Sequence, residues 1–221
     1  VTVISVSDLI EKILSVRANL AVSVAYSGTS PRTGQIRALA ISSDGESAMA
    51  CEVSSHDLDR ICTALHQTKA LAMVWDAKQL MHLIPGFVLR QNDLDLMIIS
   101  QLINDPAEFN NQNIDGGEAS FVACGVSAIA LWQATKNAII ALKSKHLESV
   151  WLNIEKPLIS ILYEMERVGI AVDPKSLHKM SEVMTKQIAD LESDIWKSAG
   201  EQFNVASPQQ LGAVLFDKLK L

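Results

Sequence analysis

Few residues of this sequence have types and spacing suited to chemistry, and the first such group lies near position 56. His56, Asp57 and Asp59 are close in sequence, and imidazole and carboxylate groups can together bind a divalent metal ion. On a helix, however, positions 56 and 59 share a face and position 57 does not. We therefore predict an exposed first helical turn, where acidic side chains are favourable, and not a metal site.

Other candidate groups favour a structural role over a catalytic one. The stretch GTSPRTG at residues 28–34 lacks the Gly-Lys-Ser/Thr ending of a phosphate-binding loop, so we interpret it as a turn. Cys51, Cys62 and Cys124 have no short spacing, which is typical of buried thiols in a reducing compartment and predicts no zinc cluster. Apolar neighbours favour core packing over base stacking for the tryptophans, which are Trp75, Trp132, Trp151 and Trp196.

The composition is that of a globular, mildly acidic chain. Its 221 residues are 48% hydrophobic and 20% charged, with a formal net charge of −6. These values support a packed core and argue against a basic nucleic-acid-binding module, while leaving room for a local contact face. The longest apolar run, residues 119–132, is shorter than a membrane span, and the first residues do not resemble a signal peptide. We therefore predict a cytoplasmic protein with no membrane partner.

The elements that must position these groups form two regions. In the first region, the patterns predict a mixed α/β layer domain with a hairpin turn at Asp44-Gly45. We expect a first helix at residues 7–17 that begins at Ser7 as its cap, and a loop or linker at residues 108–117. The strands are expected at residues 20–27, 35–44, 46–53 and 70–76, and the further helices at residues 54–67, 77–84 and 93–105.

The second region, from Glu118 onward, is predicted to be entirely helical. Residues 118–145 form one helix or two, and a helix at residues 147–168 ends at Gly169. The next helix is capped by Asp173 and ends at Gly200, and the last begins at Ser207. The last helix carries an apolar stripe that we expect to pack partly on the preceding helix and to remain partly exposed; the stripe is Leu211, Val214, Leu215 and Leu219.

Several short motifs in residues 154–221 resemble the start of the polymerase module of family A DNA polymerases, the bacterial DNA polymerase I type. The matching residues cover about a third of the chain and are Glu155, Pro157, Leu158, Leu162, Met165, Glu166, Gly169, Val172, Asp173, Phe203, Asn204, Ser207, Pro208, Gln210 and Leu211. The resemblance implies that these helices are the base and stem of a thumb that holds primer–template DNA. It also implies that the remainder of a polymerase domain is a partner and that Mg²⁺ serves the parent polymerase, in the bacterial cytoplasm at the nucleoid.

By its place in the chain, the first region is then similar to the 3′–5′ exonuclease domain of that family, a ribonuclease H-like fold. Two stretches support this likeness, residues 74–83 and residues 94–106, with Asp95 at a commonly acidic position. The resemblance implies a domain at residues 1–150 with a mixed sheet and flanking helices. It implies that residues 151–221 are the N-terminal, all-α part of a polymerase domain.

Proofreading requires about four carboxylates that hold two metal ions. The positions that match the family's acids are instead Ala25, Ser27, Leu80 and Gly125, and no acid lies between Arg17 and Ser43 or between Ala119 and Thr135. We therefore predict no catalytic residue, metal or cofactor in this chain, and an inactive domain that serves as a structural brace. Asp76 lies near the second motif, but one carboxylate cannot hold two ions, and we interpret it as a helix cap.

One face of the helix that begins at residue 174 is a candidate DNA contact. Lys175, Lys179 and Lys186 are spaced by 4 and 7 residues and share a face, and the resemblance implies that thumb helices lie along the DNA backbone. A solvated face of mixed charge is the alternative, because the helix also carries acids. For the whole chain, the alternative is an independent α/β protein whose helical tail binds another protein.

Overall fold

The computed structural model describes residues 1–104 and 118–220, and it separates the chain into two compact units, Val1–Val168 and Gly169–Leu221. The predicted loop at residues 108–117 lies outside the described residues. The sequence-based boundary stood at residue 150, whereas the first unit continues to Val168. The reason is packing: α7 (Lys156–Val168) contacts α3 (Ala77–Leu83), and Trp151 and Ile159 are buried in the core of the first unit.

A mixed sheet forms the centre of the first unit. Its strands within the described residues are β1 (Thr2–Val3), β2 (Asn19–Ser27), β3 (Gln35–Ser42), β4 (Met49–Glu52), β5 (Leu71–Val74) and β6 (Leu94–Asp95), in the order β1-β4-β3-β2-β5-β6. β2, β3 and β4 are antiparallel neighbours, and the other pairs are parallel. The predicted hairpin is confirmed: Asp44 accepts the N–H groups of Glu46 and Ser47, and Gly45 supplies a φ of +76°.

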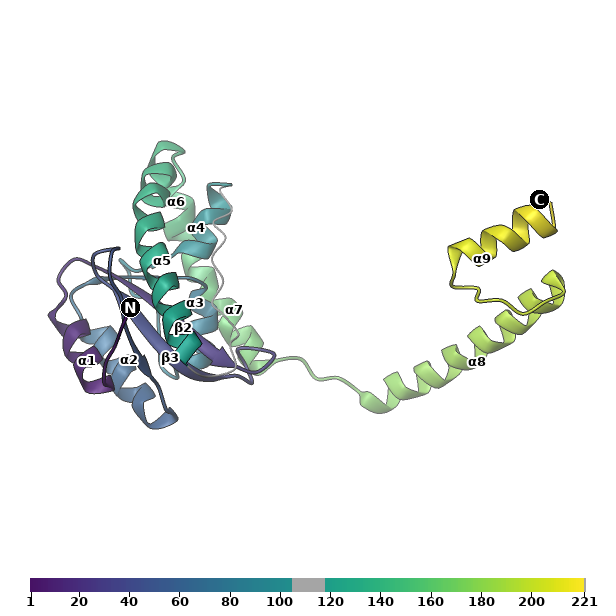
Figure 1. The fold of residues 1–221 in the computed structure, drawn as a ribbon, viewed down its shortest axis with the longest axis horizontal. Coiled ribbons are helices and arrows are strands. Elements are labelled where there is room, and N and C mark those ends of the chain that lie inside the picture. Colours follow the sequence, from purple (N-terminus) through teal and green to yellow (C-terminus); the bar gives the residue numbers. More distant parts are fainter. Residues whose placement is uncertain (105–117, 221) are drawn as a thin grey trace. The chain divides into compact units, whose positions relative to one another are not determined.

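The two faces of the sheet differ in the size of their side chains. α5 (Glu118–Ser144), one continuous helix, crosses β2, β3 and β4 (Figure 1). Beneath it lies a cluster of small buried residues that lets the helix approach the sheet closely; the cluster is Ala25, Ala38, Ala40, Ala50, Cys124 and Ala128. Larger residues that alternate with these, such as Val24 and Leu39, belong instead to the main core with α1 (Val6–Ser15) and α2 (Leu58–Gln67).

Three of the boundaries that differ from the sequence-based prediction lie at helix starts. Ser5, not Ser7, caps α1 by accepting the N–H of Asp8, and Ser7 accepts a hydrogen bond from Arg60. The helix predicted from residue 54 starts as the 3₁₀ turn η1 (Ser55–Asp57) before α2. The helix predicted at residues 93–105 is β6 followed by α4 (Leu96–Leu102), because Asp95 pairs with β5 and then caps the helix.

The helical segment that ends the first unit is continuous but irregular. It consists of α6 (Glu148–Val150), the π-helical turn η2 (Trp151–Glu155) and α7. The predicted end at Gly169 agrees with the positive φ of +70° at that glycine.

The second unit is a long helix followed by a short one. α8 (Pro174–Ala199) is capped by Asp173 and ends at Gly200, and α9 (Pro208–Gly212) begins at Ser207 and continues into η3 (Ala213–Lys218), as predicted. The apolar stripe of the last helix and α8 line one groove of about 300 Å³. Val214 is buried and Leu219 is 42% exposed, so the expected partial packing is confirmed.

Candidate functional site

The four positions where carboxylates would be required lie in different surroundings. Ala25 is 1% exposed and belongs to the alanine-rich cluster under α5. Leu80 is equally buried, in the main core, whereas Ser27 lies at the end of β2 and accepts a hydrogen bond from Arg37 at 3.1 Å. A methyl group at Gly125 would lie 2.5 Å from a side-chain carbon of Val1. That part of α5 therefore faces the N-terminal residue of the chain, and the α5 residues clustered with Ala25 are Cys124 and Ala128.

Asp76 is a helix cap, as predicted. Its carboxylate accepts the N–H of Gln79 at 2.9 Å, which closes the first turn of α3. The residue adopts a left-handed backbone conformation with φ of +58°, which Asp tolerates better than most residues. Burial raises the pKa of this carboxyl. In the described part of the chain, no group of three or more His, Cys, Asp or Glu residues could hold a metal ion.

Asp95 has a structural role that sequence reasoning did not identify. It is 1% exposed and caps its own helix, α4, by accepting the N–H groups of Met97 and Ile98. It also accepts the N–H groups of Asp76 and Ala77, at 3.3 and 2.7 Å, at the start of α3. Burial raises the pKa of Asp95 to about 6, against the opposing effect of these donors. One carboxylate thus closes the starts of two helices.

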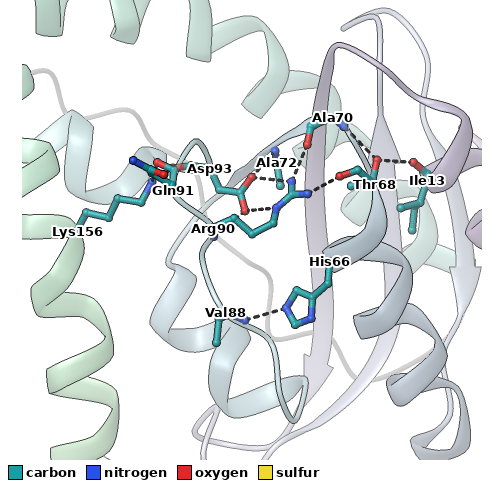
Figure 2. A network of polar contacts seen from close by, with 10 residues as sticks. All are labelled: Ile13, His66, Thr68, Ala70, Ala72, Val88, Arg90, Gln91, Asp93 and Lys156. Atoms are coloured by element: carbon teal, nitrogen blue, oxygen red, sulfur yellow. Dashed lines mark hydrogen bonds and ion pairs between the residues drawn. The ribbon is translucent and has the colours of Figure 1, made fainter.

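A second buried network holds the segment that precedes β6 (Figure 2). Arg90 forms a bidentate ion pair with Asp93, with distances of 2.8 and 2.7 Å, and also donates to the carbonyls of Thr68 and Ala70. Asp93 in turn accepts the N–H of Ala72 in β5. Lys156, the first residue of α7, donates to the carbonyls of Gln91 and Asp93. This network ties α7 to the edge of the sheet.

The other end of α7 carries an ion cluster around Glu166. The carboxylate lies 2.6 Å from Lys78 Nζ, 2.9 Å from His82 Nε2 and 3.3 Å from an Arg32 guanidinium nitrogen. The hydrogen bond from Lys78 is the main cause that lowers the pKa of Glu166 to about 2. Lys78 and His82 come from α3. Arg32 comes from the 28–34 loop, so this loop, predicted to be a turn, also contacts α7 through Arg32.

The comparisons with known proteins support the resemblance. A family model described as DNA polymerase family A matches residues 174–221. DNA polymerase I of Bacillus caldotenax is 39% identical over 94 residues, which cover 42% of this chain and 11% of that protein. DNA polymerase I of Rhizobium leguminosarum is 40% identical over 93 residues, which cover 42% of this chain and 9% of that protein. These matches support a fragment of a family A DNA polymerase.

The chain also has a solved structural relative. The POL domain of Pol1 from M. smegmatis, in complex with DNA primer-template and dNTP, aligns with a TM-score of 0.69 and 22% identity over 98% of this chain and 40% of that one. The likeness shows a shared fold. The matches to the curated relatives span about a tenth of their length.

The remaining candidate residues of the chain are exposed or structural. His56 and Asp59 are exposed, and Asp57 accepts hydrogen bonds from Ser54, so the predicted exposed first turn is confirmed. The three cysteines are buried free thiols, and burial raises the pKa of Cys51 and Cys124 to about 12. Trp151 is buried as predicted for core packing, and Trp196 donates to the carbonyl of Phe203. None of the described helices is long and apolar enough to cross a membrane.

The three candidate DNA-binding lysines lie on α8 with exposed side chains. Among the described residues, Lys175, Lys179 and Lys186 make no side-chain ion pair, whereas Lys197 pairs with Asp194. Exposed apolar residues on the same helix include Leu177, Met180, Met184, Ile188 and Leu191. At roughly 100° per residue, these five residues centre about 160° from the three lysines, whereas the exposed Val183 lies about 60° from them. Glu182 and Asp190 lie within about 40° of the centre of the lysines. The helix therefore has a lysine-bearing face of mixed charge and a roughly opposite apolar face.

Proposed function

We propose that this chain is part of a DNA-directed DNA polymerase of the DNA polymerase I type, which extends a primer on a template with dNTPs and Mg²⁺. The observation that carries the proposal is the family match at residues 174–221, extended by the relatives' identity of 39–40% over more than ninety residues. We place the parent protein in the bacterial cytoplasm, at the nucleoid. The 221 residues alone are not expected to polymerise, because the matches span only about a tenth of the relatives.

Residues 1–150 of the first unit, called here the α/β unit, are proposed to be an inactive 3′–5′ exonuclease-like domain with a structural role. Its mixed sheet and covering helices suit that fold, and neither Ala25 nor Leu80 leaves room for a solvated carboxylate. The Lys156 and Glu166 contacts join this unit to α7, which carries the first of the polymerase-like motifs. These contacts favour a structural role, in which the unit supports the polymerase-like segment, over a role in DNA hydrolysis.

The lysine-bearing face of α8 is proposed to contact phosphates of primer–template DNA as part of a thumb. Exposed ammonium groups on one face, without an ion-pair partner among the described residues, suit the regular spacing of a DNA backbone. The opposite apolar face is proposed to pack against the remainder of the polymerase domain, because isolated proteins rarely expose such a continuous stripe. In this proposal, DNA contacts one side of α8 and the rest of the polymerase domain packs on the opposite side.

Primer–template binding by the full-length polymerase tests this assignment. Replacing Lys175, Lys179 and Lys186 with Gln should weaken binding and reduce the slope of log affinity against log salt by about 0.9 for each phosphate that the protein no longer neutralises. Lys69→Gln, an exposed change on the α/β unit, is the matched control and should leave the slope unchanged. An unchanged slope in the triple variant would show that this face is only solvated.

The gene itself tests the wider proposal. The reading frame after Leu221 should continue into the rest of a polymerase domain. A stop codon directly after Leu221 would favour the independent α/β protein with a helical protein-binding tail.

A further inference from the structure

The contacts of Glu166 resemble those of a bound anion more than those of an ordinary surface ion pair. Three cationic or hydrogen-donating groups approach one carboxylate within 3.3 Å, and they come from two separate elements of the α/β unit. Lys78 and His82 are one helical turn apart on α3 and therefore project to the same side. Exposed salt bridges with a single partner contribute little, whereas a converging set of donors holds an anion in a defined place.

The local charge also favours an anion. Asp76 is a nearby acid that interacts electrostatically with Lys78 and His82, and its carboxylate accepts the N–H of Gln79. Its single negative charge offsets only part of the positive charge of Arg32 and Lys78. Without Glu166, the positive charges of Arg32 and Lys78 would stand beside His82, whose side chain is only 11% exposed. The surface of the α/β unit at this point is thus built to receive a negative group.

The rest of α7 is oriented so that Glu166 reaches this site. Residues spaced by three or four along the helix contact the α/β unit: Lys156 at the sheet edge, Ile159 in the core, and Tyr163, whose ring lies 4.8 Å from that of His82. Glu166 continues the same face by one more step. Met165, on the outward side, is 63% exposed. Because the first unit ends at Val168, Glu166 lies two residues before the chain leaves that unit.

We propose that Arg32, Lys78 and His82 form an anion-binding site whose resident ligand is the carboxylate of Glu166, and that this docking fixes the C-terminal end of α7 on the α/β unit. The site thereby sets the point from which Gly169 and the following residues depart. The inference concerns contacts within the first unit and does not depend on the proposed polymerase function.

Hydrogen exchange of the intact chain tests the docking. Glu166→Gln should accelerate amide exchange at residues 162–168 by about tenfold or more while amides of β2 and β3 remain protected. Glu164→Gln is the matched control, because Glu164 lies on the same helix and, among the described residues, forms an ion pair only with exposed Arg167. Equal exchange in the two variants would overturn the proposal. If Glu166→Gln does not fold, Arg32→Gln, which alters a half-exposed side chain, should produce a smaller acceleration in the same amides.

Inorganic phosphate tests whether the site is a true anion site. In Glu166→Ala, millimolar phosphate should raise the melting temperature by several degrees more than it does in the unmodified chain, where the carboxylate fills the site. Adding Lys78→Met to Glu166→Ala should abolish that difference. Equal effects of phosphate on the unmodified chain and Glu166→Ala, at matched ionic strength, would contradict an anion site.

Discussion

Asp95 Oδ2 accepts the backbone N–H of Ala77 at 2.7 Å, across 18 positions of sequence. The same buried carboxylate caps α4, so one side chain satisfies backbone donors at the starts of two helices. Helix starts leave N–H groups without partners within the helix, and buried donors without partners are costly. Asp95 therefore organises the edge of the sheet at which β5 leads into α3 and β6 leads into α4.

Replacing this carboxylate should lower the stability of the α/β unit. Asp95→Ala should reduce the free energy of unfolding by about 3 kcal/mol, because it removes a cap from two helices. Asp95→Asn keeps one acceptor oxygen and should lower the free energy of unfolding by a smaller amount. Urea unfolding measures both, with the exposed Asp59→Ala as control, for which a change within about 0.5 kcal/mol is expected. Equal losses for Asp95→Ala and Asp59→Ala would contradict the double-cap role.

The raised pKa of Asp95 predicts a defined pH dependence. Because its pKa is about 6 in the folded chain and near 3.8 when unfolded, the folded state binds the proton more tightly. Its contribution to stability is complete below about pH 4 and declines, by up to about 3 kcal/mol, as pH rises through 6.

Asn at position 95 does not titrate, so the stability difference between the unmodified chain and Asp95→Asn should change between pH 4.5 and 6.5. Glu166 behaves in the opposite sense: its pKa is near 2 when folded, so its contribution is lost only as pH falls below about 4.5. Urea unfolding across this pH range separates the two groups. Parallel curves for the two chains would show that Asp95 does not titrate there.

Gly45 should be intolerant of a side chain. A Cβ at this position would lie 2.3 Å from Trp132 Cε3, and φ is +76°. Gly45→Ala should therefore destabilise the unit by about 3 kcal/mol, combining backbone strain with the clash. Gly86→Ala is the control, because Gly86 has a similar φ of +81° while its nearest neighbour, Cys62 Sγ, would be at 3.7 Å. Gly86→Ala should lower the free energy of unfolding by only about 1 kcal/mol. Equal losses for the two variants in urea unfolding would show that the clash with Trp132 does not contribute.

Acidic substitutions in β2 should destabilise the chain more at a buried position than at an accessible one. Ala25→Asp places a carboxylate in the alanine-rich cluster, whose described members carry no charge, and should cost about 3 kcal/mol or more. Ser27→Glu lies at the strand end beside Arg37 and should be nearly neutral. Thermal unfolding of the two variants checks the ranking, and the reverse order would contradict the placement of β2.

The chain is expected to lack nuclease activity. Incubation with labelled single-stranded DNA and Mg²⁺ or Mn²⁺ should release no nucleotides, because two metal ions need more carboxylates than Asp76 alone supplies. Asp76→Asn should therefore change nothing in this assay. Metal-dependent release that Asp76→Asn abolishes would overturn the assignment of Asp76 as a cap.

Local signals along the chain predicted much of the fold. The hairpin at Asp44-Gly45, the cap of α3 at Asp76, and the start and end of α8 at Asp173 and Gly200 follow from residues within one turn of the feature. The cap of α1 was placed two residues late, because Ser5 and Ser7 are both suitable and only the tertiary partner of Ser7, Arg60, distinguishes them. β1 and β6 have two residues each, too few for any periodicity to reveal.

The sequence by itself determined the family likeness, the alternation of strands and helices, and the absence of acidic residues between Arg17 and Ser43 and between Ala119 and Thr135. Those properties depend on residue identity and on neighbours along the chain. Only the tertiary structure decided that Asp95 serves two helices, that Gly125 faces Val1, and that Glu166 sits among Arg32, Lys78 and His82. Those contacts join residues far apart in sequence, and their partners are selected by how the helices pack on the sheet, which no local pattern encodes.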